Sequence, residues 1–138
     1  MRTHPPTSLR TYRAVVADLR VPLIRLGRSF GYAVRGIWIA APGANMRIHL
    51  VAAGAVAVLA VARGITGARL AVVALAAGAV LAAELFNTAI ERTCDLIAQV
   101  HGLGQDERIR DIKDLAAGAV LTVALAAVTV AAALLTEP

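Results

Sequence analysis

Residues 68–97 read ARLAVVALAAGAVLAAELFNTAIERTCDLI, an apolar run followed by a run that contains acidic residues. The apolar part has the length of a helix that crosses a membrane, which needs about 20 apolar residues. The acidic part keeps good helix formers, so we expect one helix that spans the membrane and extends into the cytoplasm. Spacings of three, four and four place four polar residues on one face of this helix. They are Glu84, Asn87, Glu91 and Asp95.

Two further apolar runs flank this segment, at about residues 46–62 and 115–135. The chain has 138 residues, is 59% hydrophobic and carries a formal net charge of +5. A soluble domain of this size needs more polar surface than such tracts supply. The sequence therefore predicts an all-α membrane protein with three transmembrane helices, of which the second spans about residues 68–97 with its cytoplasmic extension.

Residues 1–22 form a basic segment, and residues 23–40 place arginines near one face with apolar side chains opposite. The second segment is typical of an amphipathic helix that lies on the membrane surface. Few aromatic residues interleave with the arginines and a span follows at once, so we expect anionic lipid headgroups as partners and no nucleic acid. The basic start and the odd number of spans place the N-terminus and the second loop in the cytoplasm.

The acidic face favours phosphoryl transfer at a membrane surface. An ionised side chain in hydrocarbon costs about 2.5 to 3.5 kcal/mol on insertion scales, so Glu84 near the lipid is expected to have a function. It is the candidate base for an alcohol. Glu91 is the candidate ligand of a magnesium ion that carries ATP, because Mg²⁺ then takes only one or two carboxylates. Asn87 lies between them and would hold a carboxylate or the substrate hydroxyl.

A second charged cluster precedes the third span. We expect Lys113 at a helix start, where backbone amides would help its ammonium group to bind phosphate. Asp114 would cap that helix or orient the lysine. Charges that only anchor the topology of the span are the alternative for this cluster. The scattered histidines have no metal-ligand spacing, and His49 is interpreted as an interfacial anchor.

Two motifs resemble the prokaryotic integral-membrane diacylglycerol kinase and undecaprenol kinase family. The first is Glu84-x-x-Asn87-Thr88-Ala89-Ile90-Glu91-x-x-x-Asp95, and the second is Lys113-Asp114-Leu115-Ala116-Ala117-Gly118-Ala119-Val120-Leu121. Weaker matches are Ser29-Phe30-x-Tyr32-Ala33-x-x-Gly36 and Asn45-x-Arg47-Ile48-His49. The residues of the lysine motif and of Arg-Ile-His resemble those of the undecaprenol kinase branch more closely.

The resemblance implies a homotrimer of three-span subunits with an N-terminal surface helix, which transfers the γ-phosphate of ATP to a lipid alcohol. In such a protein Glu84 is the catalytic base, Asn87 supports the site and Glu91 binds Mg²⁺. The positions expected to contact the nucleotide are Arg25, Tyr32, Asp95, Lys113 and Asp114. The resemblance also implies a prokaryotic inner-membrane location and a kinase domain over residues 23–138.

One departure from the family pattern concerns the metal. The family usually has another metal-binding glutamate just before the Asn-x-Arg-Ile-His stretch, where this chain has Gly43 and Ala44. Glu91 with water, or Asp95, would have to replace it, or activity would be reduced or lost. The leading hypothesis is a kinase of a lipid alcohol, with undecaprenol favoured over diacylglycerol. The alternative is a catalytically silent membrane protein of the same fold that binds lipid or nucleotide.

Overall fold

The computed structural model describes residues 25–104 and 106–136, and the described residues are helical apart from three short connections. The predicted all-α class is therefore confirmed for this part of the chain. The basic segment over residues 1–22 lies outside the described residues. A helix covers residues 25–40, and it belongs to a unit separate from the three long helices that follow. The structure thus describes a helix over residues 25–40, while its amphipathic role and its place on a membrane surface stay predictions.

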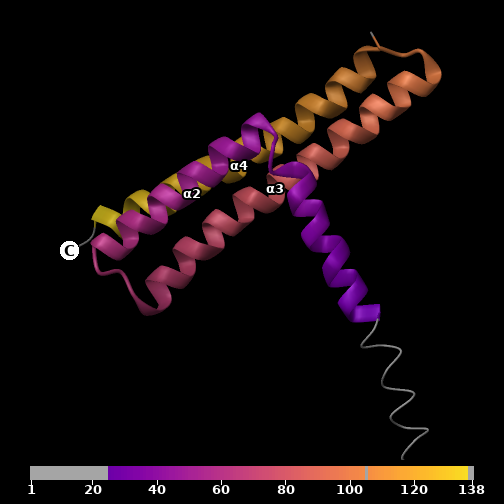
Figure 1. Cartoon of the computed structure of the whole chain (residues 1–138). Helices are drawn as coiled ribbons and strands as arrows, with labels where there is room; N and C mark the ends of the chain where they lie inside the picture. The colour runs from indigo at the N-terminus through magenta and orange to yellow at the C-terminus, as the bar shows by residue number, and fades with distance from the viewer. Residues whose placement is uncertain (1–24, 105, 137–138) are drawn as a thin grey trace, which may run out of the picture. The chain divides into compact units, whose positions relative to one another are not determined.

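Three long helices follow: α2 (Ala44–Ala62), α3 (Gly67–His101) and α4 (Glu107–Thr136). Each is long and apolar enough to cross a membrane, which confirms the three predicted spans by length and composition. α3 packs mainly against α4, and the two form an antiparallel hairpin that continues past the length of α2 (Figure 1). The polar residues of the acidic face therefore all belong to one uninterrupted helix.

The turn after α2 requires a glycine. Gly64 has φ +67°, the left-handed conformation in which a side chain is strained. Its N–H donates to the carbonyl of Val61 at 2.9 Å, and the N–H of Ile65 donates to that of Ala60 at 3.0 Å. These two bonds make a Schellman motif, in which Ile65 and Ala60 are both buried. The motif ends α2 and turns the chain toward α3.

Two arginines join this turn region to the end of α4. Arg63 Nη1 donates to the carbonyl of Leu135, and Arg69 Nη2 donates to that of Leu134, each at 2.7 Å. The last carbonyls of a helix have no partner within the helix, so these bonds satisfy groups that would otherwise be costly in an apolar medium.

α4 begins earlier than the third apolar run. Asp106 precedes the helix, and its Oδ1 accepts the backbone N–H of Arg108 at 2.9 Å, as in an N-cap. The side-chain hydrogen bonds from Arg108 also lower the pKa of the Asp106 carboxyl to about 2. Lys113 and Asp114 consequently lie in the second turn of α4. The expectation that Lys113 stands at a helix start and Asp114 caps it is wrong, because Asp106 already fills the capping position.

Small side chains fill the contacts between the helices. The buried residues of α3 and α4 include Val73, Val80, Cys94, Ala116 and Val120. Many larger side chains, such as Leu75 and Phe86, face outward and are more than two-thirds exposed in the isolated chain at 73% and 72%. Close contact through small residues is typical of helices that associate inside a membrane.

Candidate active site

Two polar residues of α3 are almost fully buried. Glu84 is 3% exposed and Asn87 is 2% exposed, although the helix around them is apolar. The Oε2 atom of Glu84 and the Oδ1 atom of Asn87 have no hydrogen-bond partner among the residues that the structure describes. Buried polar atoms are normally paired, because leaving one unpaired costs about 1 to 3 kcal/mol. Both atoms are therefore candidates for contacts with a ligand.

Glu91 lies one turn further along α3 and is tied to this pair. Asn87 Nδ2 donates a hydrogen bond to Glu91 Oε1, and the two atoms are 3.2 Å apart. Glu91 is half-buried and lies within electrostatic range of Glu84. The structure thus brings together the three residues that the sequence places at the centre of the site. It gives a carboxylate, an amide oxygen and a second carboxylate in one row.

The next turn of α3 carries Asp95, which reaches α4. Asp95 Oδ1 accepts a hydrogen bond from Lys113 Nζ at 3.0 Å. Both side chains are accessible, with exposed fractions of 67% for Asp95 and 36% for Lys113. The pair crosses the α3–α4 hairpin, so two of the expected nucleotide-contacting residues do lie side by side.

The three remaining residues that are expected to contact the nucleotide have exposed side chains. Asp114 is exposed on α4. Arg25 and Tyr32 are exposed on the helix over residues 25–40, in the other unit of the chain. A contact of these three residues with a nucleotide stays a prediction.

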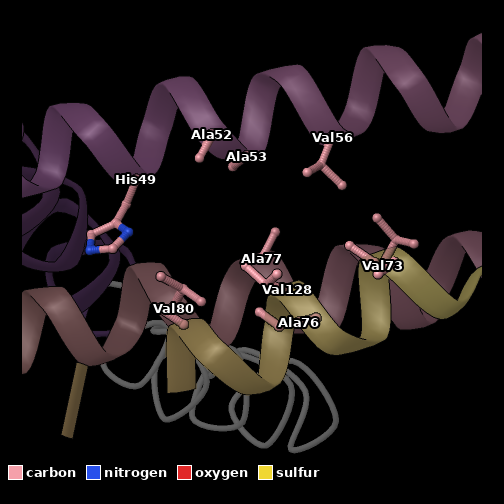
Figure 2. Close-up of a pocket in the computed structure, with 13 residues that line it drawn as sticks. His49, Ala52, Ala53, Val56, Val73, Ala76, Ala77, Val80 and Val128 are labelled. Carbon is pink, nitrogen blue, oxygen red and sulfur yellow. The ribbon is translucent and has the colours of Figure 1, made fainter. Parts of the chain in front are cut away.

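An apolar cavity of about 300 Å³ lies between α2, α3 and α4. Among the described residues, its walls are alanine and valine, and the one polar lining residue is His49 of α2. Figure 2 shows the His49 imidazole projecting from α2 toward α3 at the end of the cavity where Val80 lies. This imidazole lies within electrostatic range of Glu84.

The sequence interpretation of His49 as an interfacial anchor did not place it beside the acidic row. One signal for this position is present in the sequence. His49 is three residues after Met46, which is buried, and precedes Ala52, Ala53 and Val56 at helical spacing, so all share one face. Because α2 is apolar on every side after its first turns, that face does not stand out.

The oxygen donors of the row fit a magnesium ion carried by a nucleotide. Mg²⁺ bound with phosphates typically takes one or two carboxylates and keeps its other positions for phosphate oxygens and water. Glu91 and the unpaired Asn87 Oδ1 supply such donors. No group of three or more metal-binding side chains occurs among the described residues, and the first turn of α2, which begins just after Gly43, has no acidic residue.

Comparison with known proteins places this site in a family. Residues 31–135 match the family model described as prokaryotic diacylglycerol kinase. A diacylglycerol kinase of Synechocystis sp. is 40% identical over 111 residues, which cover 80% of this chain and 62% of that protein. An undecaprenol kinase of Bacillus subtilis is 37% identical over 109 residues, which cover 78% of this chain and 85% of that protein.

The chain thus spans less than two thirds of the length of the Synechocystis relative. No solved structure matches this chain significantly. The family match covers the three long helices and the whole acidic row, including the buried Glu84 and Asn87. The chain belongs to the prokaryotic diacylglycerol kinase family.

Proposed function

We propose that this protein transfers the γ-phosphate of ATP to the hydroxyl group of a membrane lipid alcohol, with undecaprenol favoured over diacylglycerol. The observation that carries the proposal is the buried Glu84, whose Oε2 atom accepts no hydrogen bond from any described residue. An ionised carboxylate in the apolar part of a membrane helix costs free energy, so such a residue is expected to have a function. Family membership and the names of the two relatives support the same reaction.

The reaction begins at Glu84. Its carboxylate accepts the proton of the lipid hydroxyl, and the freed oxygen attacks the γ-phosphorus of ATP in line with the bond that breaks. The bond between the γ-phosphorus and the β,γ-bridging oxygen breaks, and ADP leaves with its electron pair. Asn87 stands between base and metal ligand, where its Nδ2 holds Glu91 and its Oδ1 stays available to the site.

The residues that would bind the phosphates lie at the other end of the acidic face, beyond Glu84. Glu91 and Asn87 would hold Mg²⁺, which neutralises phosphate charge when it is bound with ATP. Lys113 supplies an ammonium group from α4, and Asp95 keeps that group directed at the site through the bond of 3.0 Å. The lipid alcohol and the nucleotide thus meet along the single face of α3.

Assembly and orientation belong to the same proposal. We expect a homotrimer in a prokaryotic inner membrane, with the N-terminus and the α3–α4 connection in the cytoplasm. Arg92 and Arg110 near that connection agree with this orientation, because cytoplasmic loops are enriched in basic residues. Anionic lipid headgroups are the expected partners of the basic N-terminal segment.

The preference for undecaprenol rests on sequence motifs. The motifs Arg-Ile-His and Lys-Asp-Leu-Ala-Ala-Gly-Ala-Val are similar to those of that branch. Transfer of label from γ-³²P-ATP to each lipid in detergent micelles tests the choice. Labelling of diacylglycerol without labelling of undecaprenol would overturn the preference.

Glu84→Gln tests the proposed base, because the amide keeps the shape of the carboxylate but cannot take the proton. We expect the turnover number to fall by about 100-fold or more, the contribution typical of general-base catalysis. Glu107→Gln is the matched control, since it makes the same change at an exposed position at the start of α4. Equal activity of the Glu84→Gln variant and the unmodified protein would remove Glu84 from the mechanism.

The absence of an acidic residue at Gly43 and Ala44 favours the second candidate, a catalytically silent protein of this fold. The same assay separates the two. If the unmodified protein phosphorylates neither lipid with ATP and Mg²⁺ but binds a lipid or ATP, it is a catalytically silent member of this fold.

A further inference from the structure

His49 is the polar end of an otherwise apolar cavity. It is half-buried on α2, and the other lining residues are alanines and valines from α2, α3 and α4 (Figure 2). A histidine that only anchored a helix at the membrane interface would have no reason to face this cavity. Its position inside the bundle calls for a partner.

The partner with the right position is Glu84. Figure 2 shows His49 at the end of the cavity where Val80 lies, and Glu84 follows Val80 by four residues, one helical turn along the same face of α3. Val80 and Glu84 are both buried, at 8% and 3% exposed. The imidazole lies within electrostatic range of the Glu84 carboxylate.

A buried carboxylate such as that of Glu84 is normally held by hydrogen-bond donors. Its Oε2 atom has no such donor among the described residues. The side-chain amide of Asn87, three residues further along α3, donates to Glu91 Oε1 rather than to Glu84 in this structure. α4 contributes only alanine and valine to the cavity wall. Among the described residues that line this cavity, His49 is the one with a side-chain N–H group.

We infer that His49 is a positioning residue for lipid phosphorylation, whose imidazole N–H holds the Glu84 carboxylate in the orientation that receives the proton of the lipid hydroxyl. The inference rests on the proposed function. Hydrogen bonds of a catalytic group are often long before substrate binds and shorten in the substrate complex. We therefore expect the bond between His49 and Glu84 to form when the substrates are bound. His49 acts through Glu84 and does not itself touch the reacting atoms.

Two substitutions separate orientation from packing. His49→Leu keeps a side chain of similar bulk but removes the donor, and His49→Gln keeps an N–H donor. We expect His49→Leu to lower kcat by about 10- to 100-fold, the range for a hydrogen bond to a charged group, with the KM for ATP within about twofold. His49→Gln should recover most of that loss. Val56→Ala, at the opposite end of the same cavity, is the matched control and should stay within about threefold of the unmodified protein.

A readout independent of turnover is the ¹⁵N NMR signal of the His49 imidazole in detergent micelles. We expect Glu84→Gln to shift this signal, and Glu107→Gln to leave it in place. Thermal unfolding of each variant shows whether it folds, and the NMR comparison uses a protein with His49 intact, so it remains decisive if His49→Leu unfolds.

The outcomes distinguish this inference from the proposed function. Equal loss of kcat in folded His49→Leu and His49→Gln would overturn the positioning role, and so would an imidazole signal that is insensitive to Glu84→Gln. A protein that phosphorylates no lipid would overturn the proposed function and with it the catalytic part of the inference. A loss of activity confined to His49→Leu, together with a shifted imidazole signal, would support both.

Discussion

The ion pair between Asp95 and Lys113 allows a structural role to be separated from a role in nucleotide binding. Asp95 Oδ1 and Lys113 Nζ are 3.0 Å apart, but the side chains of Asp95 and Lys113 are 67% and 36% exposed. Exposed ion pairs of this kind contribute about 0.2 to 1 kcal/mol, because solvent and salt screen them. Asp95→Asn should therefore lower the free energy of unfolding by no more than about 1 kcal/mol.

Catalysis should respond more strongly if Asp95 directs Lys113 toward the phosphates. A tenfold loss of kcat/KM corresponds to about 1.4 kcal/mol, which exceeds the whole expected stability effect of the pair. We expect Asp95→Asn to lower kcat/KM for ATP by more than tenfold in the radiolabel assay, with unfolding in detergent followed by circular dichroism in parallel.

The control for this experiment is another ion pair, formed by Asp106 Oδ2 and Arg108 Nη2, which are 2.8 Å apart. Asp106→Asn removes the same charge but keeps a residue that caps a helix well. It should leave kcat/KM within about threefold. A loss of less than threefold in Asp95→Asn, or an equal loss in both variants, would refute the assignment of Asp95 to the nucleotide site.

Two further predictions concern the connections between helices. Gly64→Ala places a side chain at φ +67° and should lower the free energy of unfolding by about 1 to 2 kcal/mol. The control Gly78→Ala lies in the interior of α3 with no atom within 4 Å of the new Cβ, so it should cause no loss of stability, and equal stability of both variants would contradict strain at Gly64. The Asp106 carboxyl should titrate near pH 2 by ¹³C NMR, and Arg108→Ala should return its pKa toward 3.8. Because the folded pKa is lowered, the stabilisation from this group is present above pH 3.8 and is lost as the pH falls toward 2, so an unchanged titration in Arg108→Ala would exclude Arg108 as the cause.

The sequence predicts the three long helices well because length and apolar composition alone determine them. The span expected at 46–62 is α2, Ala44–Ala62, and the segment expected at 68–97 is α3, Gly67–His101. The continuation of α3 beyond the apolar run was predictable, since the spacing of Glu84, Glu91 and Asp95 keeps a helical period.

The start of α4 was harder to predict. Residues 107–114 are mostly charged and lack the apolar run that marks a span, although charged residues form helices readily. The N-cap at Asp106 gives the true beginning, and it moves Lys113 away from the helix terminus. Apolar length therefore locates the membrane part of a helix but not the turns that extend into water.

The site shows the same division. The row of Glu84, Asn87 and Glu91 follows from spacing on one helix, and the structure keeps it. The position of His49 depends on how α2 faces α3, and the mostly apolar sequence of α2 indicates that face only weakly. Contacts within one element were predictable from sequence, whereas the contact between two elements required the packed structure.

The continuity of α3 has a mechanical consequence. Because the proposed proton acceptor and the proposed metal ligand are seven residues apart on one helix, their separation is fixed at about 10 Å by the helical rise alone. Tilting or sliding of α2 and α4 relative to α3 therefore leaves that separation unchanged. Lipid alcohols of different size would then meet the same spacing between the proposed base and the proposed metal ligand.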